Sequence, residues 1–158
     1  MRTIIFFIGV ALLCASCRKP AQKQDVMFQT GILATNAYSL FAGATAPTNV
    51  PSEISDLQAD GTVWMDMHLL CRFRAPPNII TSILANGYQT TNWDAVEVAM
   101  HPRNYTNSFS PKWDPDTIVG KECYLKRVEN KHGDDTLYLV LDRHSGVVYA
   151  VGEGSVYK

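Results

Sequence analysis

The chain has 158 residues, a formal net charge of −1, and 46% hydrophobic and 18% charged residues. This length predicts a single domain, large enough to bury about two thirds of the surface that its unfolded chain exposes. The near-zero charge, without a stripe of Lys and Arg interleaved with aromatic residues, argues against a nucleic acid partner.

The first 16 residues have the layout of a secretory signal peptide. Arg2 precedes an uncharged apolar run from residue 3 to residue 13, and the small residues Ala15 and Ser16 follow that run. The run is shorter than the about 20 apolar residues that a membrane-spanning helix needs. We therefore expect residues 1–16 to be an export signal, and no later stretch of the sequence predicts a membrane span.

The end of this segment, LLCASCRKP, resembles the lipobox of bacterial lipoproteins. Ala15 and Ser16 stand directly before Cys17, while Cys14 occupies a position where Leu or Val is commoner. The resemblance implies that Cys17 becomes an acylated N-terminus that anchors the chain in the bacterial cell envelope. Arg18, in place of aspartate, favours the outer membrane by the same analogy. An ordinary cleaved signal peptide is the alternative.

The residues after Cys17 are predicted in chain order. Residues 17–26 are polar and predict the anchor and a tether, so 27–158 form the single domain. Residues 28–41 have roughly helical spacing and predict a short helix or an apolar linker. Residues 50–61 predict either one helical turn or a short strand, because Pro51 and Gly61 punctuate them.

The middle of the chain predicts a strand followed by a helix. Apolar and polar residues alternate from residue 63 to residue 73, which predicts a strand with one apolar face. A short helix is predicted over 77–86 and docks on that face, with Gly87 in the left-handed conformation that ends helices. Residues 93–100 alternate and predict a strand, and 101–120 predict a long polar and aromatic loop.

Three strands are predicted at the C-terminus, over 121–129, 135–143 and 147–153. The segments NKHGD and HSG separate them and contain turn-forming residues. The fold class is therefore α+β: an antiparallel sheet of about four to five strands that ends in a three-stranded meander, with a short helix packed on one face.

The candidate chemical groups are few. Export would take Cys71 and Cys123 to an oxidising compartment, where they predict either a disulfide or two separate buried thiols. Asp66 and His68 share a strand face and are the candidates for catalysis or metal binding, although a solvated strand face is the explanation we favour. No third ligand is identifiable, so no metal or cofactor is predicted. Ser145 lacks the G-x-S-x-G elbow of a hydrolase nucleophile.

Aromatic residues in a proline-containing stretch give the one candidate interaction loop. In such a loop they serve either as interface anchors or as contacts that hold the loop to its own sheet. Its members are Trp93, Tyr105, Phe109 and Trp113.

The sequence therefore predicts a lipid-anchored envelope module that binds a protein or surface polymer. An envelope hydrolase or metal-dependent enzyme and a structural envelope lipoprotein are the alternatives.

Overall fold

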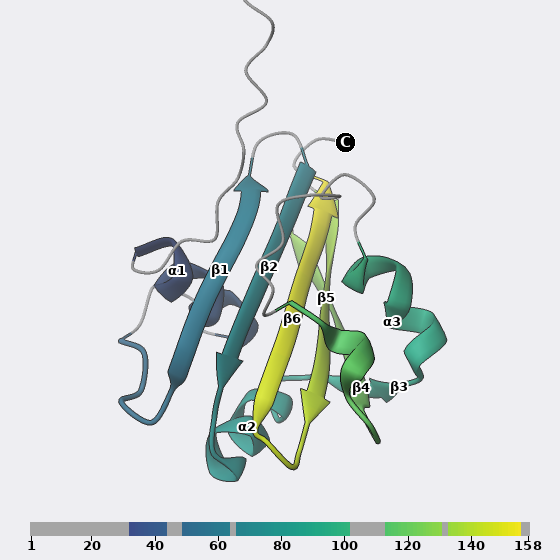
Figure 1. The fold of residues 1–158 in the computed structure, drawn as a ribbon. Helices are drawn as coiled ribbons and strands as arrows, with labels where there is room; N and C mark the ends of the chain where they lie inside the picture. Colours follow the sequence, from purple (N-terminus) through teal and green to yellow (C-terminus); the bar gives the residue numbers. More distant parts are fainter. Residues whose placement is uncertain (1–31, 44–48, 64–65, 102–112, 131–132, 156–158) are drawn as a thin grey trace, which may run out of the picture.

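The computed structural model describes residues 32–43, 49–63, 66–101, 113–130 and 133–155 of the chain (Figure 1). The predicted signal peptide, the predicted lipidation site Cys17 and the predicted tether lie outside the described residues. Within these segments an antiparallel sheet of six strands has helices on both faces, which confirms the α+β class. The elements in chain order are α1 (Ile32–Phe41), β1 (Ser55–Val63), β2 (Asp66–Arg74), α2 (Pro77–Leu84), β3 (Gln89–Thr91), α3 (Trp93–Met100), the 3-10 helix η1 (Pro115–Thr117), β4 (Glu122–Asn130), β5 (Gly133–Asp142) and β6 (Val147–Ser155).

The strand order is β1-β2-β6-β5-β4-β3, and every neighbouring pair is antiparallel. β1 and β2 form a hairpin, after which the chain passes through α2 to the opposite edge of the sheet. It returns through the meander of β4, β5 and β6, whose last strand lies beside β2 (Figure 1). The predicted meander is confirmed. The sheet has six strands rather than the expected four to five, because residues 55–63 pair with β2 and residues 89–91 pair with β4.

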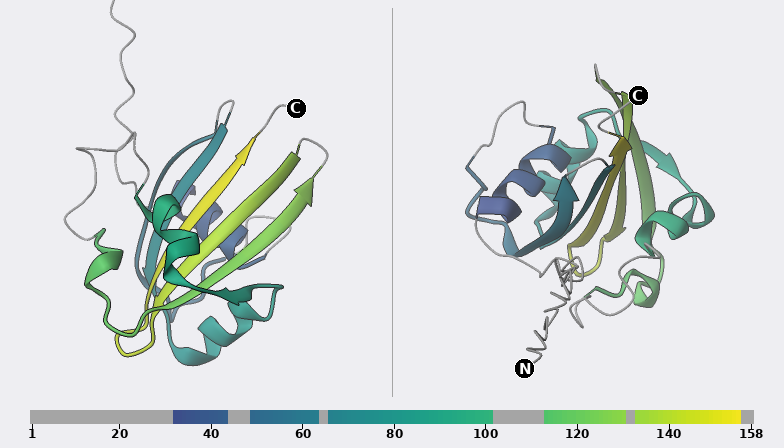
Figure 2. Two further views of the ribbon diagram at one scale, coloured as in Figure 1. Left: turned by 90° about the vertical axis from the view of Figure 1, so that its right-hand side faces the viewer. Right: turned by 90° about the horizontal axis from the view of Figure 1, so that it is seen from above.

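Each face of the sheet carries its own hydrophobic core. On one face α1 and α2 cover a cluster that includes Phe41, Phe73 and Leu139. On the other face α3 and the segment around η1 cover a second cluster that includes Met100 and Val140. Figure 2 shows the sheet between these two layers. Alternation along the strands sends odd and even residues to different cores, as the period of two requires.

The helix predicted over 77–86 is confirmed as α2. Pro77 occupies its first turn, where the missing N–H costs nothing. Ile80 and Ile83 are buried against the sheet, and Gly87 has a φ of 91° after the helix ends. The helix is short, so burial of this apolar stripe supplies the stability that eight residues lack alone.

The strand predicted over 93–100 is wrong, because this segment is the helix α3. The side chain of Asn92 accepts a hydrogen bond from the amide of Ala95 at 3.0 Å and caps the helix. Val96 and Ala99 face the second core at helical spacing, whereas Val98 is 73% exposed. The alternation of Val96 and Val98 therefore matches the pattern of a strand, although Val98 is exposed. The buried side of the helix is completed by Ala99, a small residue.

α1 settles the ambiguity over 28–41 in favour of a helix for residues 32–41. Tyr38 packs edge-to-face on Phe73 with ring centroids 5.4 Å apart. The Tyr88 hydroxyl donates to the carbonyl of Phe41 at 3.1 Å, so the end of α1 is fixed beside the segment that follows α2. None of the helices in the described segments has the length and apolar character needed to cross a bilayer.

Candidate functional site

The two cysteines of the domain are separate buried thiols. Cys71 belongs to the core beneath α1 and α2, and Cys123 belongs to the core on the opposite face. The disulfide that the sequence allowed is therefore absent, because the sheet itself stands between the two side chains. Burial raises the pKa of both thiols, which keeps them protonated and poorly nucleophilic.

The pair Asp66 and His68 lies on β2, where the main chain of His68 is opposite Glu153 of β6 and Thr62 of β1. His68 is half-buried on the face that also carries Leu70, whereas the Asp66 side chain is outside the described part of the structure. Among the described residues, no three His, Cys, Asp or Glu side chains are close enough to hold a metal ion.

The described members of the predicted interaction loop pack on their own domain. Trp113 is 9% exposed, donates from Nε1 to the carbonyl of Met100 at 3.2 Å, and lies edge-on to Tyr149 at 5.2 Å. Trp93 is half-buried at the start of α3, and the Lys121 ammonium lies 3.8 Å from its ring centroid. These two residues therefore anchor the fold. Tyr105 and Phe109 lie outside the described residues.

The tight turn between β5 and β6 is the most completely hydrogen-bonded polar feature at the end of the sheet. Oδ1 of Asp142 accepts from the amides of His144 and Ser145 at 2.9 and 3.3 Å. The Ser145 hydroxyl donates to Oδ2 of Asp142 at 2.6 Å, and Gly146 donates its amide to the Asp142 carbonyl at 2.8 Å. These bonds, led by the Ser145 hydroxyl, lower the pKa of Asp142. Because the Ser145 hydroxyl donates its hydrogen bond to Asp142, it acts here as a turn-capping group.

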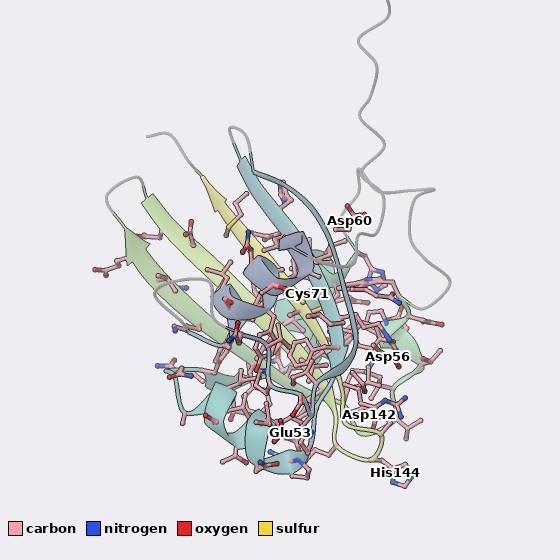
Figure 3. The ribbon with its side chains drawn as sticks, turned by 90° about the vertical axis from the view of Figure 1, so that its left-hand side faces the viewer. Glu53, Asp56, Asp60, Cys71, Asp142 and His144 are labelled. Carbon is pink, nitrogen blue, oxygen red and sulfur yellow. The ribbon has the colours of Figure 1, made fainter. Side chains whose placement is uncertain are left out.

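Two hollows flank this turn, one on each side of the sheet. The larger, of about 440 Å³, lies toward α2 and includes Glu53, Arg74 and Arg143 in its wall. The smaller, of about 340 Å³, lies toward η1 and is lined mainly by residues of 117–119 and the start of β6. His144 and Ser145 contribute to both hollows. In Figure 3, Glu53, Asp142 and His144 lie at this end of the sheet.

The two arginines of the larger hollow differ in how they are held. Nε of Arg143 donates to both carboxylate oxygens of Glu122, at 2.8 and 2.9 Å, and the Tyr124 hydroxyl donates to the same carboxylate. The Arg143 guanidinium lowers the pKa of Glu122, and Glu122 in turn raises the pKa of Arg143. Arg74, at the exposed end of β2, forms no hydrogen bond or ion pair within the described structure.

Two polar side chains inside the sheet, Asp60 and Arg72, have buried atoms without a hydrogen-bond partner. Asp60 on β1 is fully buried, and neither of its carboxylate oxygens has a hydrogen-bond partner. Burial raises the pKa of Asp60 to about 6. Nε and one terminal nitrogen of Arg72 are likewise buried without a hydrogen-bond partner. Asp60 lies toward the other end of the sheet from Asp142 (Figure 3).

Sequence analysis did not identify the surface around the β5–β6 turn as a site. The turn itself was predicted from HSG, but Arg74 and Glu53 are about 70 and 90 residues away from it in the chain. The pairing of β2 with β6 brings Arg74 opposite Val147, and the pairing of β1 with β2 brings Ser55, next but one to Glu53, opposite Arg74. Comparisons of the chain with protein-family models, with curated proteins and with solved structures find no match.

Proposed function

We propose that this chain is a lipid-anchored binding module of the bacterial envelope. In this proposal Cys17 anchors the protein in a membrane, preferentially the outer membrane, and the end of the sheet around the β5–β6 turn binds an envelope protein or polymer. The lipobox-like stretch LLCASC supports the anchor. The two hollows that meet at His144 and Ser145 support the binding surface, and they are the observation that carries it.

The construction of the turn suits a recognition surface. Its main chain is fixed by the hydrogen bonds of Asp142, so the main chain of the turn loses little further freedom when a partner binds. His144 and Arg143 are exposed beside the larger hollow, and Val119, which is 96% exposed, borders the smaller one. Polar groups and an exposed apolar residue around concave surfaces are typical of protein interfaces.

The anchor is tested by replacing Cys17 in the full-length chain expressed in a bacterial host. Cys17→Ser should abolish incorporation of an alkyne-labelled fatty acid and release the protein from the membrane fraction. Cys14→Ser is the matched control and should leave both properties unchanged. Labelling that persists in Cys17→Ser and disappears in Cys14→Ser would contradict the assignment of Cys17.

The binding surface is tested in living cells with a photo-crosslinking amino acid introduced at single positions. We expect one dominant adduct from His144 and from Val119, on the two sides of the turn. Thr90 on the edge strand β3 is the control, because it is exposed but lies outside both hollows. The same adduct from Thr90 alone, with none from the turn, would move the binding surface elsewhere.

A further inference from the structure

We propose that the larger hollow binds a phosphate group carried by the partner or ligand of this module. The inference rests on the proposed function, because it names the chemistry that the surface around the β5–β6 turn would recognise. The hollow of about 440 Å³ has room for a phosphate ester with part of the group attached to it. The donors in its wall, and the contacts that hold each of them, support this assignment.

Arg74 is the principal donor. It ends β2, its side chain is exposed, and it lines the hollow without a hydrogen bond or ion pair within the described structure. Its main chain is held on both sides, opposite Ser55 of β1 and Val147 of β6. A guanidinium offers five N–H donors in a planar fork that matches phosphate oxygens. Arg74 therefore presents a complete set of unused donors from a fixed main-chain position.

Arg143 is the second donor and is already oriented. Its Nε binds Glu122, and one terminal nitrogen lies 3.4 Å from the Tyr124 hydroxyl, so these contacts use one side of the guanidinium. The remaining terminal nitrogen has no partner in the described structure and belongs to a residue of the same wall. Because Glu122 and Tyr124 restrain the side chain, less rotamer entropy is lost when Arg143 binds an anion.

Neighbouring groups extend this donor set. His144 and Ser55 are exposed in the same wall, where the imidazole or the hydroxyl can donate to an oxygen. The first turn of α2 adds Pro76, Pro77 and Ile80 to the wall but no free N–H group, because the prolines have none and the Ile80 amide donates to the Pro76 carbonyl. Donors thus come from several elements. A tetrahedral phosphate accepts hydrogen bonds from several directions, whereas a planar carboxylate accepts them mainly in one plane.

Glu53 is the one carboxylate in the wall and opposes anion binding. It accepts a hydrogen bond from the adjacent Ser52 at 3.2 Å and forms no ion pair with either arginine. Because Glu122 already offsets the charge of Arg143, the guanidinium of Arg74 is the main positive charge in the wall. Removal of the Glu53 charge should therefore strengthen phosphate binding, so Glu53→Gln is a variant expected to increase the affinity.

The test is an NMR titration of the full-length chain in a non-ionic detergent, at constant ionic strength, with inorganic phosphate, glycerol phosphate and acetate. We expect saturable shifts of the Arg74 Nε–H and Gly146 amide signals with both phosphates, and weaker shifts with acetate. Arg74→Gln should weaken phosphate binding about tenfold, which corresponds to one charge-assisted hydrogen bond. Glu53→Gln should tighten it. Arg127→Gln, an exposed arginine of β4 outside the hollow, is the matched control and should change nothing.

The source of the phosphate is distinguished with vesicles. If the group is a lipid headgroup, the Cys17→Ser chain should sediment with phosphatidylglycerol vesicles but not with phosphatidylcholine vesicles, and Arg74→Gln should reduce that binding. If it is a soluble or polymer-bound ester, glycerol phosphate binds and the vesicles do not. Shifts that do not saturate, or equal effects of Arg74→Gln and Arg127→Gln, would overturn the proposal. Crosslinks from His144 would still be expected then, so the two proposals fail separately.

Discussion

Two aspartates at different places in the sheet show how strongly surroundings decide the state of one side chain. Asp142 sits in the β5–β6 turn with two backbone amides and a hydroxyl as donors, and its pKa is lowered. Asp60 sits on β1, fully buried and without a hydrogen-bond partner, and its pKa is raised to about 6. One carboxylate is stabilised in its charged form, and the other is destabilised in that form.

The two arginines near these aspartates differ in the same way: Arg143 is hydrogen-bonded, whereas Arg72 has buried nitrogens without a partner. Near the turn, Nε of Arg143 donates hydrogen bonds to both carboxylate oxygens of Glu122. In the sheet, Arg72 pairs with Gln58, two residue pairs along from the pairing of Asp60 with Leu70, and its guanidinium lies 5.7 Å from the Tyr149 ring centroid. Asp60 and Arg72 are two positions apart on adjacent strands, yet the buried atoms of each lack the hydrogen bonds that would offset their burial. Proximity alone therefore does not make a stabilising pair.

The largest expected effect comes from removing the Asp60 charge. Because its pKa is raised, folding favours the protonated form, and this stabilisation is complete below about pH 4 and is lost as the pH rises through 6. Asp60→Asn should therefore raise the free energy of unfolding at pH 8 by up to about 3 kcal/mol and change it little at pH 4. Urea unfolding at both pH values measures this.

Asp134→Asn is the matched control for the substitution itself, since Asp134 is exposed on β5. A loss of stability in Asp60→Asn that is equal at both pH values would mean that the carboxylate has a structural partner.

The second prediction concerns the geometry of the turn. Gly146 and Gly120 have nearly the same left-handed φ, 70° and 69°, but a Cβ on Gly146 would lie 2.6 Å from the carbonyl oxygen of Ala75, and one on Gly120 meets nothing within 4 Å. Gly120→Ala should cost about 1 kcal/mol for the conformation alone. Gly146→Ala should cost about 2–3 kcal/mol because the clash adds to it. Equal losses in thermal unfolding would show that the turn moves away from Ala75.

The third prediction reverses the pH dependence of the first. Asp142→Ala removes the acceptor of the turn and should cost about 1–2 kcal/mol at pH 7. The pKa of Asp142 is lowered, so its contribution is present above about pH 4 and is lost as the pH falls further. The difference between wild type and Asp142→Ala should therefore shrink in acid. A constant difference from pH 7 to pH 2 would contradict the role of its charge.

The smallest effect is the coupling within each charged pair. A double-mutant cycle with Glu122→Gln and Arg143→Gln should give about 0.5–1 kcal/mol at low salt and less at 1 M salt, because both side chains are partly exposed. The cycle with Asp60→Asn and Arg72→Gln should give less than about 0.5 kcal/mol, since the two groups share no hydrogen bond. A larger coupling in the second cycle would show that Asp60 and Arg72 pair in solution.

Local sequence determined much of this protein. The period of two in β2 and in the three C-terminal strands, Pro77 at the start of α2, and the residues of the turns predicted those elements correctly. These features are local because they depend on side-chain alternation and on backbone preferences that a few residues express by themselves. The lipobox-like stretch is also local, and the function that it implies stays a proposal.

Tertiary structure decided the rest. Val96 and Val98 alternate as in a strand, but the second core selects Val96, Ala99 and Met100 and makes α3 a helix. Cys71 and Cys123 are kept apart because the sheet lies between the two cores. Arg74 meets the β5–β6 turn only because the last strand of the chain pairs with β2. A site made of residues far apart in sequence depends on strand order, and alternation within a strand carries no information about which strand becomes its neighbour.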